Sequence, residues 1–319
     1  MTADKWTDEA LERLEKRIKR EYAQASKDLQ EKAEKYFSNY KERWEKEYKA
    51  FQDGKYTEAQ FKAWELSQLG RGEHWNELKQ QMTERMAQSI EIAKNYSNGV
   101  LPSVYVRNSN EIASLAQASA MEQGVAGVKF DLVDEYTVKR LMENASEVKP
   151  YKPIAINLPK QNSWNMNNIQ NALLQGILQG DSITHLADRF QSVANMNRAQ
   201  AIRSARTAVT GAQSAGKQDR YEDLASKGCI VTKMWVATDD DNTRKEHAQA
   251  MEDYGTEEKA IPYDEPFEVG GEELMYPADK SGSAWNIYNC RCTMKTGKIK
   301  FKSVLSDEKR KEARIKVYG

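Results

Sequence analysis

A regular apolar spacing over residues 7–52 constrains the fold of this 319-residue chain more than any other feature. Apolar residues recur there mostly in steps of three, four and four, an 11-residue repeat of about 3.67 residues per turn. They are Leu11, Leu14, Ile18, Tyr22, Ala25, Leu29, Ala33, Tyr36, Tyr40, Trp44, Tyr48 and Phe51. Such a stripe stays on one face of a nearly straight helix, which at 1.5 Å per residue is about 70 Å long. The spacing predicts one long helix with Thr7 as its N-cap and Asp53-Gly54 as its end.

Two interpretations of this helix are open. It is either a solvated helix with one packed face or an arm that docks on a partner or on another copy of itself. Its aromatic residues are large for a narrow coiled-coil seam and suit a protein interface.

Shorter helices are predicted to follow. Thr57 is expected to cap one that ends near Leu69, and the next runs from about Glu73 to Tyr96, where Ser97-Asn98-Gly99 ends it. The segment 101–106 contains Pro102 and is expected to be extended. Further helices are predicted over 109–123 and 134–146, with a short strand or a linker between them at 128–133.

A proline-rich segment, 147–162, is the expected domain boundary, because each proline lacks a backbone donor and disfavours helix in its predecessor. Three helices are predicted after it, over about 164–179, 181–193 and 197–227, with Gly228 as the C-cap of the last. Small residues dominate the centre of that last helix, so other elements are expected to approach its backbone closely.

The composition changes at Ile230. A β-branched, apolar run predicts a strand at 230–238, followed by a short helix over 243–251. Residues 267–276 are typical of a hairpin with Gly270-Gly271 as its turn, and 290–294 of another short strand. We therefore expect a mainly α protein with a small α+β C-terminal module. Its predicted parts are an elongated helical N-terminal region (1–150), a helical region with a long helix (151–229), the α+β module (230–296) and a basic C-terminal tail (297–319).

Charge and cysteine content limit the functional classes. Lys plus Arg and Asp plus Glu are equal at 48 each, which argues against a chain-wide field for nucleic acid or membranes. No run of 18 apolar residues occurs, so no membrane span is expected, and the N-terminus lacks the order of a signal peptide. Three cysteines do not make a disulfide framework, and synthesis in a reducing cytosol is expected.

One group of residues has the character of metal ligands. His247 with Cys290 and Cys292 offers an imidazole and two thiolates, which zinc accepts in a tetrahedral set. Asp241 is the first candidate for a fourth ligand, with Asp279 and Cys229 as others. The alternative is a small fold in which buried thiols pack and His247 hydrogen-bonds a neighbour.

A catalytic Cys–His dyad is the third interpretation of this group, with Arg291 lowering a thiol pKa. No oxyanion-hole signature supports it. Asp241 suits a helix-capping role and Arg244 an ion pair, and both roles are structural.

The C-terminal segment 295–319 carries nine Lys or Arg and three Asp or Glu. A helix is predicted over 304–317. Such a segment is either a solvated tail or a contact for DNA or an acidic partner. The candidate nucleic-acid contacts are Lys309, Arg310, Lys311 and Arg314.

The C-terminal module also resembles a known family. It contains a Trp-x-Ala-Thr start at Trp235, an Arg-x-x-His step at Arg244 and His247, a Tyr-Pro-x-Asp step ending at Asp279 and the run Asn289-Cys290-Arg291-Cys292. Together these motifs are similar to those of the phage Mu F-like family of head morphogenesis (minor head or minor capsid) proteins. The helix that contains Ala205-Arg206-Thr207 and Ala212-Gln213 fits as well. The resemblance covers about 165–296, and one departure is Asp253-Tyr254-Gly255, where the family has Asp-Gly.

The resemblance implies a structural, non-enzymatic virion component made in the bacterial cytoplasm. Such proteins lie in the capsid interior near the portal vertex, bind the portal protein and assist head assembly and DNA packaging or delivery. The resemblance also implies further partners, namely the major capsid or scaffolding protein and the packaged double-stranded DNA. In this interpretation Trp235, Arg244, Asp279, Asn289 and Arg291 are structural motif residues. A hydrolase or toxin-like activity in the C-terminal module and DNA binding by the basic tail are the alternatives.

Overall fold

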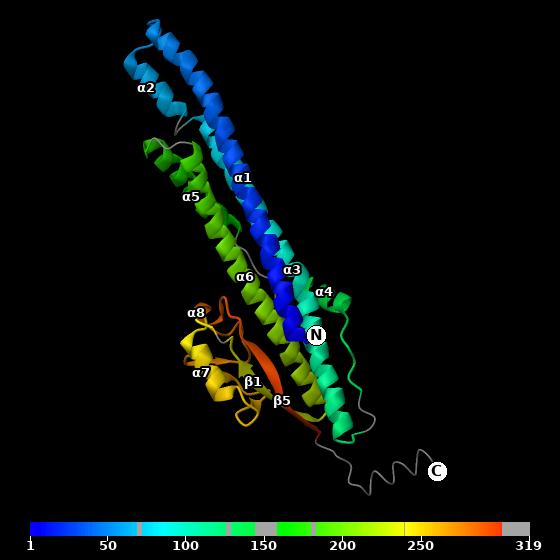
Figure 1. The fold of residues 1–319 in the computed structure, drawn as a ribbon. Helices are drawn as coiled ribbons and strands as arrows, with labels where there is room; N and C mark the ends of the chain where they lie inside the picture. Colours follow the sequence, from blue (N-terminus) through cyan, green and yellow to red (C-terminus); the bar gives the residue numbers. More distant parts are fainter. Residues whose placement is uncertain (69–71, 126–128, 144–157, 180–182, 239, 302–319) are drawn as a thin grey trace, which may run out of the picture. The chain divides into compact units, whose positions relative to one another are not determined.

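The computed structural model describes the chain except for residues 69–71, 126–128, 144–157, 180–182, 239 and 302–319 (Figure 1). Eight helices occur among the described residues: α1 (Ala3–Gln52), α2 (Glu58–Leu66), α3 (Glu73–Glu122), α4 (Glu135–Glu143), α5 (Leu158–Gln179), α6 (Ile183–Ser226), α7 (Lys245–Tyr254) and α8 (Ala284–Ile287). The strands are β1 (Cys229–Val236), β2 (Ile261–Pro262), β3 (Phe267–Val269), β4 (Glu272–Leu274) and β5 (Thr293–Phe301). The expected class, mainly α with a small α+β C-terminal module, is confirmed.

The chain divides into two compact units, each built from separate segments. The sheet-bearing unit comprises Met1–Arg13, Ser97–Ile154 and Arg203–Gly319, and the helical unit comprises Leu14–Tyr96 and Ala155–Ile202. Helices α1, α3 and α6 each contribute residues to both units. The four-part division expected from the sequence stays a prediction, and most of its proline-rich boundary lies outside the described residues.

The apolar stripe of α1 forms the core of the helical unit, as its spacing predicts. Its members from Leu14 to Ala33 are at most 3% exposed. They share this core with α3 residues that recur at helical spacing, namely Trp75, Leu78, Met82, Met86, Ile90 and Ala93. Burial of this face, rather than helix propensity alone, stabilises a helix of this length.

The aromatic end of the stripe packs inside the unit. Trp44 and Tyr48 contact Phe61 of α2, and Tyr40 stacks on Trp64. The Trp44 indole N–H also donates to Glu65 Oε1 at 2.6 Å. Because Tyr40, Trp44 and Tyr48 stay half-buried, α2 covers them only in part.

Several helix ends differ from the expectation. Thr7 is not an N-cap, because α1 begins at Ala3 and the buried Thr7 hydroxyl donates to the Ala3 carbonyl. Thr2 takes that place, since its Oγ1 accepts from Lys5 N–H at 3.3 Å, and Ala3 N–H donates to Glu111 of α3 at 2.9 Å. Thr57, by contrast, does cap α2, in a capping box with Gln60.

The predicted breaks in α3 and α6 are wrong. Helix α3 runs through Ser97-Asn98-Gly99 and Pro102, and α6 joins the two helices expected over 181–193 and 197–227. Ser97, Leu101, Val104 and Asn108 are all buried, so tertiary packing outweighs the local signals. An interior proline removes one helical hydrogen bond without ending the helix here.

The sheet-bearing unit contains a three-stranded antiparallel sheet in the order β2-β1-β5 and a separate β3–β4 hairpin. The predicted hairpin turn is confirmed, because Gly270 and Gly271 both have positive φ, as a type I′ turn requires. Strand β5 is longer than expected and continues to Phe301. The predicted helix over 304–317 lies outside the described residues.

Helix α6 packs closely against its neighbours in this unit through small residues, as expected. Ala205, Ala208, Ala212 and Ala215 are buried, and a Cβ on Gly216 would lie 2.5 Å from the Tyr105 carbonyl of α3. Only glycine permits that approach.

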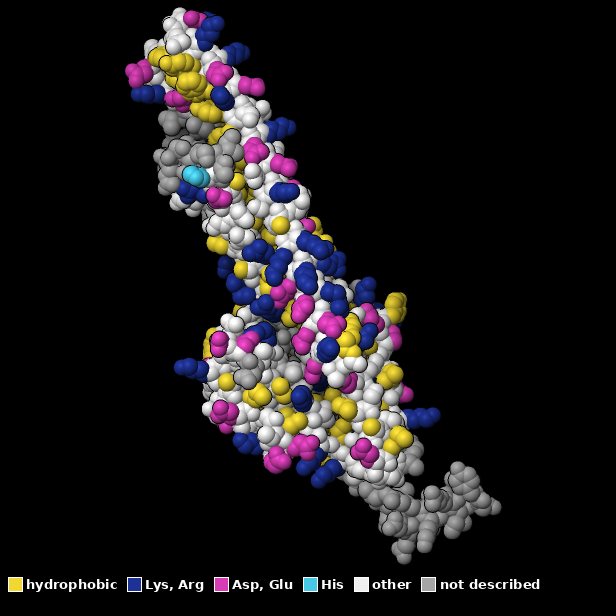
Figure 2. All heavy atoms as spheres, in the orientation of Figure 1, with side chains coloured by type: hydrophobic (Ala, Val, Ile, Leu, Met, Phe, Trp, Pro, Cys, Tyr) yellow, Lys and Arg dark blue, Asp and Glu magenta, His cyan; other side chains and the backbone are white. Residues whose placement is uncertain are grey.

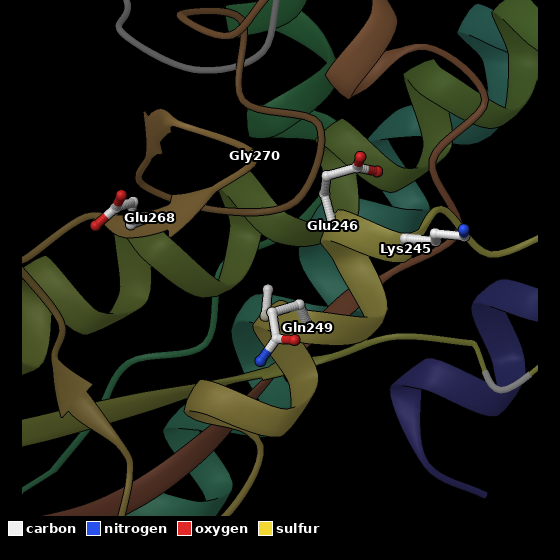
Figure 3. Close-up of a pocket in the computed structure, with 6 residues that line it drawn as sticks. Lys245, Glu246, Gln249, Glu268 and Gly270 are labelled. Atoms are coloured by element: carbon white, nitrogen blue, oxygen red, sulfur yellow. The ribbon is translucent and has the colours of Figure 1, made fainter.

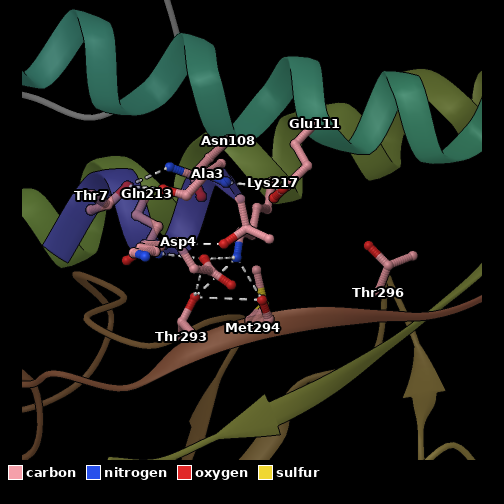
Figure 4. Close-up of polar contacts among 12 residues, drawn as sticks. Ala3, Asp4, Thr7, Asn108, Glu111, Gln213, Lys217, Thr293, Met294 and Thr296 are labelled. Atoms are coloured by element: carbon pink, nitrogen blue, oxygen red, sulfur yellow. Dashed lines mark hydrogen bonds and ion pairs between the residues drawn. The ribbon is translucent and has the colours of Figure 1, made fainter. Parts of the chain in front are cut away.

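A buried ion pair holds the first turn of α1 in the same unit (Figure 4). Lys217 of α6 is 2% exposed, and its Nζ donates to Asp4 Oδ1 at 2.5 Å, Met294 O at 2.7 Å and Thr293 Oγ1 at 3.0 Å. Gln213 donates to the same Asp4 oxygen at 2.6 Å. Segments far apart in sequence are thereby joined through one charged side chain.

None of the described helices has a stretch long and apolar enough to cross a lipid bilayer.

Candidate functional site

The sheet-bearing unit brings the predicted metal-ligand residues together. His247 lies in the first turn of α7, and Cys290 and Cys292 lie between α8 and β5. All three are buried, and their ligand atoms lie within 4.8 Å of one another. His247 Nδ1 is 3.2 Å from Cys292 Sγ and 3.7 Å from Cys290 Sγ. The sequence-predicted cluster of one imidazole and two thiols is thus assembled, and we call it the His–Cys–Cys cluster.

Asn286 of α8 sets the orientation of the His247 ring. Its Oδ1 lies 2.8 Å from His247 Nε2, while its Nδ2 donates to Val269 O and Glu272 Oε2, both at 2.9 Å. Because an amide oxygen only accepts, Nε2 must be the protonated nitrogen. The Nδ1 lone pair therefore faces the two sulfurs, which is the arrangement that metal-binding histidines use.

The spacing of the cluster fits a tetrahedral ion. Zn–S and Zn–N bonds of about 2.3 and 2.0 Å at tetrahedral angles place sulfur and nitrogen about 3.5 Å apart. The observed separations of 3.2 and 3.7 Å lie on either side of that value. The same separations are compatible with thiol–imidazole hydrogen bonds, so the geometry permits both states.

The electrostatics of the cluster favour one thiolate. A hydrogen bond from Cys292, together with His247, holds the pKa of Cys290 well below its ordinary value despite burial. The hydrogen bond to Cys290 and burial raise the pKa of Cys292. Burial alone would lower the pKa of His247. The hydrogen bond to Cys290, the charge of Cys290 and the hydrogen bond to Asn286 together raise that pKa. Of the two thiols, Cys290 is therefore the one whose thiolate form its surroundings favour.

The expected fourth ligand does not join the cluster. Asp241 is exposed and is not among the residues whose ligand atoms converge. Asp279 accepts from the backbone N–H groups of Met275 and Ser281, so its carboxylate shapes its own loop. Cys229 is buried elsewhere in the core.

The other motif residues surround the cluster. Trp235 is fully buried, and its ring meets those of His247 and Phe267 edge to face at 5.6 and 5.3 Å. Arg244 donates to the Tyr288 carbonyl at 2.5 Å. Asn289 has a positive φ of 58°, and its N–H donates to Thr207 of α6.

Arg291, which separates the two cysteines, points to a different partner. It forms a two-bond ion pair with Asp240 at 2.5 and 2.6 Å. That bond to Arg291 lowers the pKa of Asp240 to about 2. The pair ties the segment after β1 to the cysteine segment.

Asn286 and Thr210 are the supporting residues that the sequence did not reveal. Thr210 of α6 donates to the Cys290 carbonyl at 2.8 Å. Neither residue lies in a recognisable spacing relative to the cysteines, so no signal in the sequence pointed to them.

The predicted nucleic-acid contacts Lys309, Arg310, Lys311 and Arg314 lie outside the described residues.

A shallow pocket lies beside the cluster but does not include it (Figure 3). It has a volume of about 300 Å³ between α7 and the β3–β4 hairpin. Its lining includes Lys245, Glu246 and Gln249 of α7 with Glu268 and Gly270 of the hairpin. No cluster residue lines this pocket, so its carboxylates and the buried thiols do not form one reaction centre.

Comparison with known proteins identifies the region that holds this site. Residues 167–295 match the family of phage Mu protein F like proteins. The match contains all three cluster residues and confirms the resemblance expected for about 165–296.

Two characterised proteins are similar to the chain. The minor head protein GP7 of Bacillus phage SPP1 is 24% identical over 294 residues, which are 91% of this chain and 84% of GP7. An NAD(+)–arginine ADP-ribosyltransferase of Enterococcus faecalis is 31% identical over 126 residues, which are 40% of this chain but only 24% of the transferase. No solved structure matches the chain.

Proposed function

We propose that the protein is a minor head protein of a tailed bacteriophage and acts in head morphogenesis. The observation that carries this proposal is the similarity to the SPP1 minor head protein over 91% of the chain. It extends across the phage Mu F-like region and both compact units. A role confined to a single shared domain would not account for that coverage.

Within the head, the proposal places the protein in the capsid interior at the portal vertex, after synthesis in the host cytoplasm. Its partner there is the portal protein, with the major capsid or scaffolding protein as a further candidate, and its role is head assembly and DNA packaging or delivery. The half-buried aromatic residues at the α1–α2 end support a protein contact, because Trp and Tyr are enriched in interfaces.

Co-expression with the portal protein of the phage that encodes this chain tests the proposal. The two proteins are expected to elute together on size-exclusion chromatography, and the chain is expected in heads purified from infected cells. Heads that contain the portal protein but lack this chain by mass spectrometry would refute the proposal.

We also propose that the His–Cys–Cys cluster holds a structural zinc ion. A tetrahedral ion would take three ligands from this cluster and one from elsewhere, and it would stabilise the module rather than act on a substrate. Elemental analysis is expected to find about one zinc per chain, and none in a Cys290→Ser/Cys292→Ser variant. A metal-free wild-type protein would leave packed thiols or a reactive dyad, which thiol-modification rates would separate.

The enzymatic alternative rests on the transferase similarity. That match leaves 76% of the transferase unaligned, so the shared part need not carry its chemistry. Incubation of the purified chain with NAD(+) and an arginine-containing acceptor is expected to release no nicotinamide. Turnover that disappears in a His247→Ala variant with an intact fold would instead support an enzyme in the C-terminal module.

A further inference from the structure

One stretch of α1 carries an unbalanced positive surface in a chain of zero net charge. Between Leu14 and Asp28, five basic residues are exposed, and we call them the basic strip: Lys16, Arg17, Lys19, Arg20 and Lys27. Figure 2 shows Lys and Arg side chains gathered along this part of the helix. The whole strip belongs to the helical unit.

The acidic residues of the same stretch are turned away from solvent. The side chains of Glu15 and Glu21 are each 14% exposed, and that of Asp28 is 26% exposed. Glu15 lies 3.9 Å from Lys19, at the edge of the strip, and pairs with that lysine. Arg85 of α3 binds Glu21 at 2.9 Å and Asp28 at 2.5 Å. These two carboxylates are therefore already engaged by an inward-facing arginine, and their charge is not available to neutralise the strip.

Helix geometry aligns the strip. At 3.6 residues per turn, Lys16, Arg20 and Lys27 point within about 40° of one another, opposite the buried Ile18 and Leu29. They span about 16 Å along the axis. The remaining two flank this line, and Arg17 is braced over the Tyr96 ring at 3.9 Å. The row is straight and held on a packed helix.

We propose that the basic strip binds the phosphate backbone of double-stranded DNA. A row of guanidinium and ammonium groups on a packed helix can follow a line of phosphates and reads no sequence. A membrane surface is disfavoured, because the apolar face of α1 is buried in the unit and has no free side to insert into lipid. The proposal deepens the proposed head function, in which packaged DNA is a partner, and assigns that contact to α1 rather than to the tail residues.

The remainder of α1 offers a matched control. Its exposed charged residues from Glu31 to Lys46 are balanced, with three lysines (Lys35, Lys41, Lys46) and three glutamates (Glu31, Glu42, Glu45). The test variant is Lys16→Gln/Arg20→Gln/Lys27→Gln, and the control is Lys35→Gln/Lys41→Gln/Lys46→Gln. Both remove three positive charges from solvent-exposed positions of one helix, and Gln keeps a similar helix propensity.

The experiment is fluorescence anisotropy of a 30-base-pair duplex with the full chain over a salt series. We expect the test variant to lose about tenfold or more in affinity at 100 mM salt, and its log–log salt slope to fall by about 3. The control is expected to keep the wild-type slope. Circular dichroism melting should be unchanged in both.

Three results would overturn the proposal: no binding by the wild type at low salt, equal losses in both variants, or unchanged binding by the test variant. Tighter binding to anionic phosphatidylglycerol vesicles than to DNA would also overturn it, in favour of a membrane contact. This experiment uses the purified chain, so a failure to bind DNA would refute the DNA contact and leave the proposed head function intact. Absence of the chain from purified heads would refute the head function and leave the measured DNA binding intact.

Discussion

Asn286 shows how a single residue organises the candidate site. Its side chain bonds His247, Val269 and Glu272, and it is fully buried. We expect Asn286→Ala to lower the free energy of unfolding by about 2–4 kcal/mol, because buried partners lose their hydrogen bonds. Any metal affinity should fall about 10- to 100-fold, because the His247 tautomer is no longer held.

Urea denaturation and metal titration measure the two effects of Asn286→Ala. Gln249→Ala on α7 is the control, since that amide makes only an exposed bond to Asp253. Equal stability losses in the two variants would remove the special role of Asn286.

The cluster ligands were predictable from residue type, whereas Asn286 was not, because an asparagine acquires such a role only through its position in three dimensions.

Lys233 on β1 predicts a pH dependence. It is fully buried, its Nζ donates to Met275 O at 2.8 Å, and it lies over the Phe267 ring. Burial lowers its pKa to about 7, against the opposing influence of Asp279, Asp264 and Glu265. The unfolded chain therefore binds more protons above pH 7, and stability rises with pH from about 7 toward 10.

A Lys233→Met variant isolates this contribution. It should be more stable than the wild type at pH 6, where the buried ammonium is charged. The difference should shrink by at most about 1.4 kcal/mol per pH unit above pH 7. Urea titrations at pH 6, 7.5 and 9 measure it, and a difference that stays constant with pH would show that Lys233 keeps its charge throughout.

At the scale of elements, the first turn of α1 is fixed by charge as well as by packing. Asp4→Ala leaves Lys217 buried with only Thr293 Oγ1 and the Met294 carbonyl as partners. We expect a loss of about 3–5 kcal/mol, because an uncompensated buried charge is costly. A Lys217→Met change made in addition should recover most of it. Denaturation of the two single variants and the double variant measures the coupling, with exposed Glu12→Ala as control, and strictly additive losses would contradict the ion pair.

The helices also show what sequence patterns can and cannot predict. The stripe of α1 has one period from Leu11 to Phe51, so a long helix follows from local information alone. Helix α3 contains Gly99 and Pro102, whose local preferences favour a break. Its continuity depends on buried contacts of Leu101, Val104 and Asn108, and those contacts form only in the folded unit. The Asp4–Lys217 pair, 213 residues apart, was beyond sequence reasoning for the same reason.

At the scale of the whole molecule, the two compact units make a prediction about metal removal. The His–Cys–Cys cluster lies entirely in the sheet-bearing unit, and the buried stripe from Leu14 to Ala33 lies in the helical unit. If the proposed zinc stabilises its own unit, a chelator should lower amide-exchange protection in β1 and β5 by more than tenfold, since local stability tracks local structure. Protection over residues 18–33 should change little.

Hydrogen exchange with mass spectrometry resolves the two regions in one experiment. The Cys290→Ser/Cys292→Ser variant should reproduce the chelated pattern without a chelator, and adding a chelator to it should change nothing further. An equal loss over both regions would mean that the helices shared by the units, α1, α3 and α6, couple them into one cooperative structure. A local loss would show that the phage Mu F-like region can be loosened while the helical unit, with its basic strip and aromatic end, stays folded.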